Sequence, residues 1–199
     1  MKRILLIRHG QTDWNVEGRW QGHRDIPLSA EGVEQAHALA DHLRGRPISA
    51  VHSSNLLRAH ATAVVIAEPH GLKVKDDPRW RELNLGVFQG LTLTEISAKY
   101  PQEARRMRED YMNHRIPEGE TRLEMQERVY TAYTEIIAHA PGDEIAVVSH
   151  GGPIRMLLLK LFGEAILQQS VQNTSISTIE TDGETHRLVE APATPHLID

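Results

Sequence analysis

Two short apolar runs, far apart in the chain, predict strands that are buried on both faces. Residues 4–7 and 145–148 contain no polar side chain, and continuous apolar runs of this length are typical of the strands of parallel sheets. Each run is followed within two residues by a His-Gly pair, at His9 and at His150. Parallel strands end at one edge of their sheet, which is the edge where α/β proteins bind ligands. The pattern therefore predicts that His9 and His150 lie together.

The segment between residues 13 and 68 adds the alternation of helix and strand that a parallel sheet needs. A polar loop over 13–28 is followed by Ser29, a suitable helix N-cap, and by apolar residues at a helical spacing as far as Gly45. Residues 48–52 then predict a second strand and residues 56–68 a second helix. This order is the signature of right-handed βαβ units and indicates an α/β fold.

The middle of the chain is more polar and predicts shorter elements. Residues 73–76 favour a short edge strand. Thr92 and Glu95 form a capping box, which predicts the start of a short helix. A polar helix is expected over 101–115, before a break at 117–120.

The last third of the chain returns to longer apolar patterns. Thr121 begins a second capping box and a helix that continues to about residue 140, and an apolar helix is predicted over 154–162. Residues 175–181 and 186–190 favour two strands joined by an Asp-Gly turn. The residues after 191 are expected to be loose.

Length and composition indicate a single domain and argue against nucleic-acid-binding, disulfide-bonded and membrane proteins. With 199 residues we expect a single domain over 1–199. The net charge of −5, without a long run of one sign, argues against nucleic-acid binding. The lack of cysteine excludes disulfides and thiolate metal sites. No stretch has the length of a signal-peptide core or a membrane span, so we expect a cytoplasmic protein with no membrane partner.

Four cationic or ionisable residues fall at strand ends or just beyond them. Arg8 and His9 follow the first strand, Arg58 lies in the first turn of the second predicted helix, and His150 follows the strand at 145–148. Guanidinium groups can each hold two oxygens of an anion, and neighbouring glycines let backbone N–H groups approach it closely. These residues therefore predict a phosphate or carboxylate site.

Five motifs resemble, in order, those of the histidine phosphatase superfamily, and together they span residues 4–155. The motifs are Leu6-Ile7-Arg8-His9-Gly10-Gln11-Thr12 with Asn15 and Gln21-Gly22; Ser53-Ser54-Asn55-Leu56-Leu57-Arg58-Ala59; Arg81-Glu82 with Gly86 and Gln89-Gly90; Pro117-Glu118-Gly119-Glu120-Thr121; and Ser149-His150-Gly151-Gly152. The resemblance implies the phosphoglycerate-mutase-like fold. This is a three-layer α/β/α sandwich whose mostly parallel central sheet has an antiparallel edge, with a helical cap of about residues 88–120 over the site.

The resemblance also implies a covalent mechanism. His9 would attack phosphorus to give a phosphohistidine, which splits one difficult displacement into two easier ones. Glu82 would protonate the leaving oxygen and then activate water, so its carboxyl must be protonated in the first step. The remaining implied catalytic residues, which hold the phosphoryl oxygens, are Arg8, Arg58 and His150. The implied substrate-binding residues are Asn15, Gln21, Gly22 and Gly151.

Within this superfamily the chain looks most like the small broad-specificity bacterial phosphatases. Cofactor-dependent phosphoglycerate mutases typically have Asn-Lys after the Gln-Gly pair, where this chain has Leu91-Thr92-Leu93-Thr94. The resemblance therefore implies metal-independent hydrolysis of phosphate monoesters of small metabolites, with no cofactor. A phosphoglycerate mutase with the same phosphohistidine chemistry is the alternative. A homodimer is also implied, although no residue pattern here demonstrates one.

Two other kinds of site use the same residues. His9, His150 and Glu82 could form a zinc set, but two arginines beside it would repel a dication, and we expect no metal. A phosphate-binding module without turnover would lack the nucleophile or the acid, and both are present.

The sequence leaves open the role of Asn55 in the second motif and the role of four large side chains in the cap. Asn55 stands where the family usually has Asp, and we expect it to cap a helix equally well. The cap residues Phe88, Tyr100, Met107 and Tyr111 either contact substrate or pack the cap onto the domain.

Overall fold

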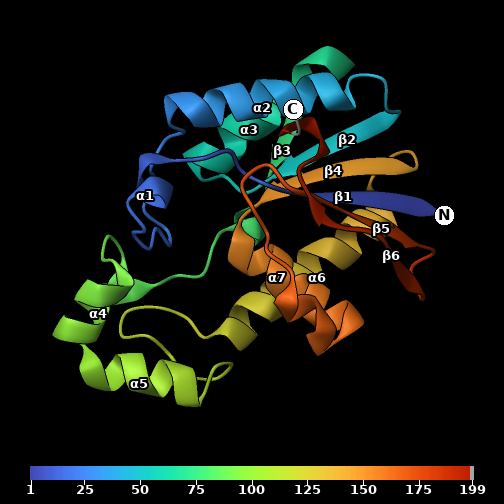
Figure 1. Cartoon of the computed structure of the whole chain (residues 1–199). Coiled ribbons are helices and arrows are strands. Elements are labelled where there is room, and N and C mark those ends of the chain that lie inside the picture. Colours follow the sequence, from blue (N-terminus) through green and yellow to red (C-terminus); the bar gives the residue numbers. More distant parts are fainter. Residues whose placement is uncertain (198–199) are drawn as a thin grey trace.

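The central sheet of the computed structural model has the strand order β3-β2-β4-β1-β5-β6 (Figure 1). The structure describes residues 1–197. The first four strands of the chain run parallel, whereas β5 is antiparallel to β1 and β6 is antiparallel to β5. The strands are β1 (Lys2–Arg8), β2 (Ile48–Ser53), β3 (Val74–Asp76), β4 (Glu144–Ser149), β5 (Ile176–Thr181) and β6 (His186–Ala193). The predicted parallel sheet with an antiparallel edge is confirmed.

Helices cover both faces of the sheet, with α2 and α3 on one side and α6 and α7 on the other (Figure 1). The helices are α1 (Asp13–Val16), α2 (Ala30–Leu43), α3 (Leu57–Ala67), α4 (Leu93–Lys99), α5 (Pro101–Glu109), α6 (Arg122–His139) and α7 (Gly151–Phe162). Short 3₁₀ turns lie at Glu68–His70, Pro78–Trp80, Gly86–Phe88, Glu164–Gln168 and Pro195–Leu197. Across residues 1–197, every helix is too short or too polar to cross a membrane.

Strand β1 is buried on both faces, as its unbroken apolar run predicts. Leu5 and Ile7 pack into the hydrophobic cluster beneath α2 and α3, while Ile4 and Leu6 pack into the cluster beneath α6 and α7. Successive side chains of a strand point to opposite faces, so a strand between two helical layers has no solvent-facing position for a polar residue. The three-layer sandwich follows from this pattern.

Strands β1 and β4 are direct neighbours and in register at their carboxyl ends. Arg8 lies opposite Ser149, and the His9 N–H donates to the Ser149 carbonyl oxygen at 3.0 Å. This pairing brings His9 beside His150, with ring centroids 5.1 Å apart. The proximity that the two apolar runs predict is thus observed.

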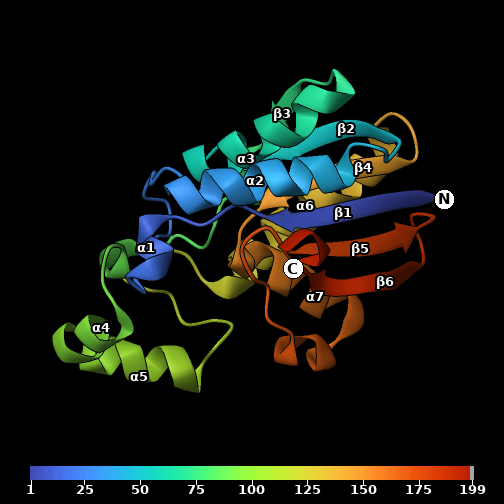
Figure 2. The same ribbon diagram turned by 45° about the horizontal axis from the view of Figure 1, so that its top comes forward.

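The cap helices α4 and α5 stand away from the sheet, beyond the carboxyl end of β1 (Figure 2). Their buried side chains, which include Ile96 and Met107, belong to the same hydrophobic cluster as Ile4 of β1. The helix predicted over 101–115 is too long, because α5 ends at Glu109. Asp110 leaves the helical region of φ and ψ, and its carboxylate accepts the Asn113 N–H at 3.1 Å instead. Aspartate side chains that bind nearby backbone in this way compete with helix continuation.

Two other segments are more ordered than predicted. The expected loop 13–28 begins with α1, which is opened by a capping box between Thr12 and Asn15. The tail after residue 191 is not loose as far as residue 197: β6 continues to Ala193, and a 3₁₀ turn follows. The His196 Nε2–H of that turn donates to Thr174 Oγ1 at 3.0 Å, which ties the tail to the core. Residues 198–199 lie outside the described residues.

Candidate active site

His9 is nearly buried at the end of β1, and its hydrogen bonding fixes one ring nitrogen. Nδ1 lies 2.6 Å from the Gly10 carbonyl oxygen. A carbonyl can only accept, so Nδ1 carries the proton and Nε2 keeps its lone pair. Nε2 makes no hydrogen bond to the described residues, and the ring lines an open cavity. His9 therefore presents an unprotonated nitrogen, the form that a nucleophile requires.

Arg8 and Arg58 flank His9, and each has a guanidinium N–H group without a hydrogen-bond acceptor in the described chain. Arg8 Nη1 donates to the Val171 carbonyl oxygen at 2.7 Å, and the two Nη atoms of Arg58 donate to the carbonyl oxygens of Arg24 and Gly22 at 2.8 and 2.9 Å. The Nε atoms of both arginines are buried and unpartnered within residues 1–197. A buried donor without an acceptor costs free energy, and an anion between the two side chains would relieve that cost.

Burial and neighbouring cations determine the protonation of both histidines. The pKa of His9 lies well below its usual value because of burial and then the charges of Arg58 and Arg8. The pKa of His150 is lowered in the same way, by burial and then by Arg58. His150 Nε2 is 2.8 Å from Ser54 Oγ, and Nδ1 has no partner in the described chain. Both rings are thus neutral near pH 7 in the free protein. The pKa of Arg58 falls only to about 10 through burial, so this side chain stays charged.

The predicted substrate-binding residues Asn15, Gln21 and Gly22 gather around His9 in a cavity of about 190 Å³. Asn15 Oδ1 accepts hydrogen bonds from Thr12 and from Asn173 Nδ2. The amide NH₂ of Asn15 makes no hydrogen bond within the described chain and can face a ligand. Gly151 lies in an adjoining cavity of about 300 Å³, which also includes Arg8 and Glu82.

Glu82 lies where the two cavities meet, because it lines both of them. Its carboxylate accepts the Leu83 N–H at 2.8 Å and the Gly152 N–H at 3.2 Å, and it forms no ion pair within residues 1–197. Arg81 forms no ion pair with Glu82, and its Nε donates instead to Asn55 Oδ1 at 2.7 Å. A carboxyl group beside His9, without a fixed cation, is available to exchange a proton with a bound ester.

The prediction that Asn55 caps the next helix is wrong. The N-cap of α3 is Leu56, which offers no side-chain acceptor, and the Leu57 N–H donates to Asp25 Oδ1 at 2.6 Å. The acceptor at the start of α3 is thus Asp25, from the loop before α2, and the Asn55 side chain accepts a hydrogen bond from Arg81 instead.

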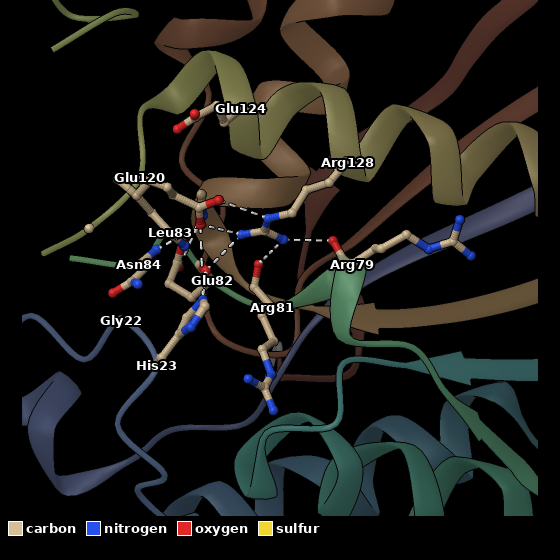
Figure 3. A network of polar contacts seen from close by, with 12 residues as sticks. Gly22, His23, Arg79, Arg81, Glu82, Leu83, Asn84, Glu120, Glu124 and Arg128 are labelled. Carbon is tan, nitrogen blue, oxygen red and sulfur yellow. Dashed lines mark hydrogen bonds and ion pairs between the residues drawn. The ribbon is translucent and has the colours of Figure 1, made fainter. Parts of the chain in front are cut away.

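The backbone on both sides of Glu82 is held by Arg128 of α6 (Figure 3). The Arg128 guanidinium donates to the carbonyl oxygens of Arg79, Arg81 and Glu82 at 2.6, 2.7 and 2.9 Å, and it pairs with Glu120 at 2.6 Å. The Glu82 carbonyl oxygen also lies 2.8 Å from His23 Nε2. Helix α6 thereby fixes the irregular segment that carries Glu82.

Sequence reasoning missed several residues that support or line the site. Asn173 Nδ2 donates to the His9 carbonyl oxygen at 2.9 Å, and Thr174 N donates to the Arg8 carbonyl oxygen at 3.0 Å. Arg122 and Arg155 line the larger cavity. These residues lie outside the five motifs, and no spacing in the chain relates them to His9, so only the tertiary structure identifies them.

The cap residues divide between the two roles left open by the sequence. Phe88 and Met107 are buried in the core cluster, and Tyr100 packs against it, with its ring 5.7 Å from that of Phe88. Tyr111 instead lines the larger cavity. Packing therefore accounts for three of these side chains, and only Tyr111 is placed to meet a ligand.

Known proteins resemble this chain over nearly its whole length. The family model described as the histidine phosphatase superfamily (branch 1) matches residues 4–194. A protein of Yersinia enterocolitica named "Probable phosphoglycerate mutase GpmB" is 36% identical over 183 residues, which cover 90% of this chain and 85% of that protein.

Solved structures show the same fold. A mycobacterial glucosyl-3-phosphoglycerate phosphatase superposes with a TM-score of 0.82 at 34% identity, covering 95% of this chain and 98% of the other. The α-ribazole phosphatase of Shigella flexneri gives a TM-score of 0.86 at 28% identity, with 96% of each chain covered. The expected phosphoglycerate-mutase-like fold is confirmed by these neighbours. From its motifs, its fold and its family match, the chain is an enzyme of the histidine phosphatase superfamily, branch 1.

Proposed function

We propose that this enzyme is a metal-independent phosphatase that hydrolyses phosphate monoesters of small metabolites through a phosphohistidine on His9. The observation that carries the proposal is the pair of buried, unpartnered guanidinium Nε atoms of Arg8 and Arg58 beside the unprotonated His9 Nε2. A phosphoryl dianion would satisfy both donors while its phosphorus lies against the nucleophile.

The reaction has two displacements at phosphorus. In the first, the His9 Nε2 lone pair forms a P–N bond as the P–O bond to the alcohol breaks, and the Glu82 carboxyl gives its proton to the leaving oxygen. In the second, water attacks phosphorus, Glu82 takes a proton from that water, and the P–N bond breaks to release inorganic phosphate. Arg8, Arg58 and His150 hold the phosphoryl oxygens throughout.

A phosphoglycerate mutase is the second candidate, and the name of the Yersinia relative favours it. A mutase would return the phosphoryl group from His9 to a hydroxyl group of the substrate in place of water. The phosphatase is favoured by the names of the structural neighbours and by the residues that follow Gln89-Gly90.

The test measures phosphate release from a panel of monoesters, including p-nitrophenyl phosphate and 3-phosphoglycerate, at pH 5.5 and 7.5 with excess chelator. We expect release from several esters, one added phosphoryl group on the peptide that contains His9, and a loss of at least about 10³-fold in kcat for His9→Ala. His37→Ala, on the exposed face of α2, is the matched control. Conversion of 3-phosphoglycerate to its 2-isomer without release would favour the mutase, and loss of activity with chelator would contradict metal independence.

A further inference from the structure

The larger cavity beside His9 carries two cations that the proposed chemistry does not use. It encloses about 300 Å³ and adjoins the cavity of His9 through their shared residues Arg8, Glu82 and Leu85. Beyond Glu82 it is lined by Arg122 at the start of α6 and by Arg155 of α7. If the phosphoryl group binds at His9, the alcohol part of the ester extends into this space.

Neither arginine has an anionic partner within residues 1–197, unlike Arg128, which is paired with Glu120. Arg122 Nη1 donates to the Tyr111 carbonyl oxygen at 2.9 Å, and its guanidinium carbon lies 4.0 Å from the centroid of the Tyr111 ring. Arg155 has one long contact, 3.4 Å, to the Gln169 carbonyl oxygen. Stacking on a ring orients a guanidinium but leaves donors free for a carboxylate or a phosphate.

The charge of the cavity is unbalanced, because Glu82 is the one acidic residue among its described lining residues, which include three arginines. The pKa of Arg8 is lowered by burial, which the charge of Glu82 partly opposes, and the nearby charge of Arg155 lowers it further. Partly buried cations without counter-ions are unfavourable, and an anionic ligand group relieves that cost.

Most of the other lining side chains are apolar, and the space is small. Leu83, Met125, Met156 and Val171 line the cavity, and its volume is at the lower end for small-molecule sites. A short carbon chain fits such a lining.

We propose that Arg122 and Arg155 bind a second anionic group, a carboxylate or a phosphate, on the alcohol part of the substrate. The preferred substrates are then short phosphate monoesters with an anion at each end. This inference rests on the proposed function, since it assigns the substrate class of the same site.

The test compares three propyl esters that differ only at the end remote from the phosphate ester. They are 3-hydroxypropyl phosphate, 3-phosphonooxypropanoate and propane-1,3-diyl bisphosphate. We expect kcat/KM for the better anionic ester to exceed that of the hydroxyl ester by at least about tenfold, because a charge-assisted hydrogen bond stabilises binding by that much. The ranking of carboxylate against phosphate identifies the second anion.

Substitutions attribute this preference to the two side chains. Arg122→Gln and Arg155→Gln should each reduce the ratio of anionic to hydroxyl ester several-fold, and the double variant should bring it near one. The control is Arg105→Gln, at an exposed position of α5 where the arginine pairs with Glu109. It should leave kcat/KM unchanged for both the anionic and the hydroxyl ester. Equal thermal unfolding of the variants shows that they are folded. The inference would be overturned if the ratio of kcat/KM for anionic to hydroxyl ester were near one in the unsubstituted enzyme. It would also be overturned if neither single variant changed that ratio.

Binding separates this inference from the proposed function. Calorimetric titration of His9→Ala with the same three esters measures the preference without turnover. Tighter binding of the anionic esters with no phosphate release from the unsubstituted enzyme would leave the second anion site standing while the phosphatase fails. Release from all three esters, with equal binding, would leave the phosphatase standing while the anion site fails.

Discussion

At the scale of single residues, the position of the Glu82 carboxylate depends on residue 152 having no side chain. A Cβ atom at Gly152 would lie 2.1 Å from Glu82 Oε1, the flexible end of that side chain. Gly152→Ala should therefore change the free energy of unfolding little but displace the carboxylate. We expect kcat/KM for p-nitrophenyl phosphate to fall by about 10–100-fold. Gly45→Ala, which points into open space, is the control; unchanged kcat/KM in Gly152→Ala would contradict the placement of Glu82.

We expect Asn173 to position His9. Its Nδ2 bridges the His9 carbonyl oxygen and Asn15 Oδ1, at 2.9 and 3.3 Å. Asn173→Ala removes both bonds, each worth on the order of 1 kcal/mol, so we expect kcat to fall by about tenfold with a smaller change in KM. Steady-state kinetics measures this split, and Asn113→Ala in the cap turn should leave both constants unchanged. If Asn173→Ala lowered the free energy of unfolding but left kcat and KM unchanged, Asn173 would have only a structural role.

The residues that could be predicted from the sequence are those whose position along the chain determines their position in space. Arg8 ends a buried strand, and His9 and His150 follow buried strands, so the sheet itself brings them to one edge. Asn173 could not be found in this way, because its contact with His9 joins residues 164 positions apart. The error at Asn55 has the same cause, since Asp25 reaches the start of α3 from another loop.

At the scale of elements, Arg128 connects α6 to the segment that carries Glu82. Its substitution by methionine would remove one donor from each of three carbonyl oxygens and the charge partner of the Glu120 carboxylate. We expect Arg128→Met to lower the free energy of unfolding by about 2–3 kcal/mol and to lower kcat/KM as well. Urea unfolding measures the first effect. Arg44→Met, which breaks an exposed pair with Asp41, is the control; equal loss in both variants would contradict the special role of Arg128.

Element boundaries were predictable where they are set by neighbouring residues. The capping boxes at Thr92 and Thr121 correctly predicted the starts of α4 and α6, because both partners lie within one turn. The order of the tail was not predictable. The extension of β6 depends on pairing Ala193 with Ile176, and the last turn depends on the bond between His196 and Thr174.

At the scale of the whole molecule, the buried neutral histidines make stability depend on pH. The folded pKa values of His9 and His150 lie well below the unfolded value of about 6.5. Below about pH 6.5 the unfolded chain therefore binds more protons than the folded one, and the free energy of unfolding falls as the pH falls. Each such histidine contributes a slope of at most about 1.4 kcal/mol per pH unit.

Urea unfolding between pH 7.5 and 5.0 measures this slope. His9→Ala should be less sensitive to acid than the unsubstituted enzyme, because one of these groups is removed. His37→Ala, whose side chain lies on the exposed surface of α2, should keep the original slope. Equal slopes for His9→Ala and the unsubstituted enzyme would show that His9 is not neutral in the folded state.

The strand order also has a consequence for synthesis on the ribosome. β1 pairs with β4 and β5 and with no earlier strand, so each residue from Arg3 to Arg8 waits for a β4 partner that is made 141 residues later, between Glu144 and Ser149. At translation rates of about 5–20 residues per second, that interval is roughly 7–28 s. Throughout it the apolar residues Ile4 to Ile7 lack the two strands that flank them in the folded sheet. The two histidines of the site, His9 and His150, therefore come together only after the chain has grown by the 141 positions that separate them.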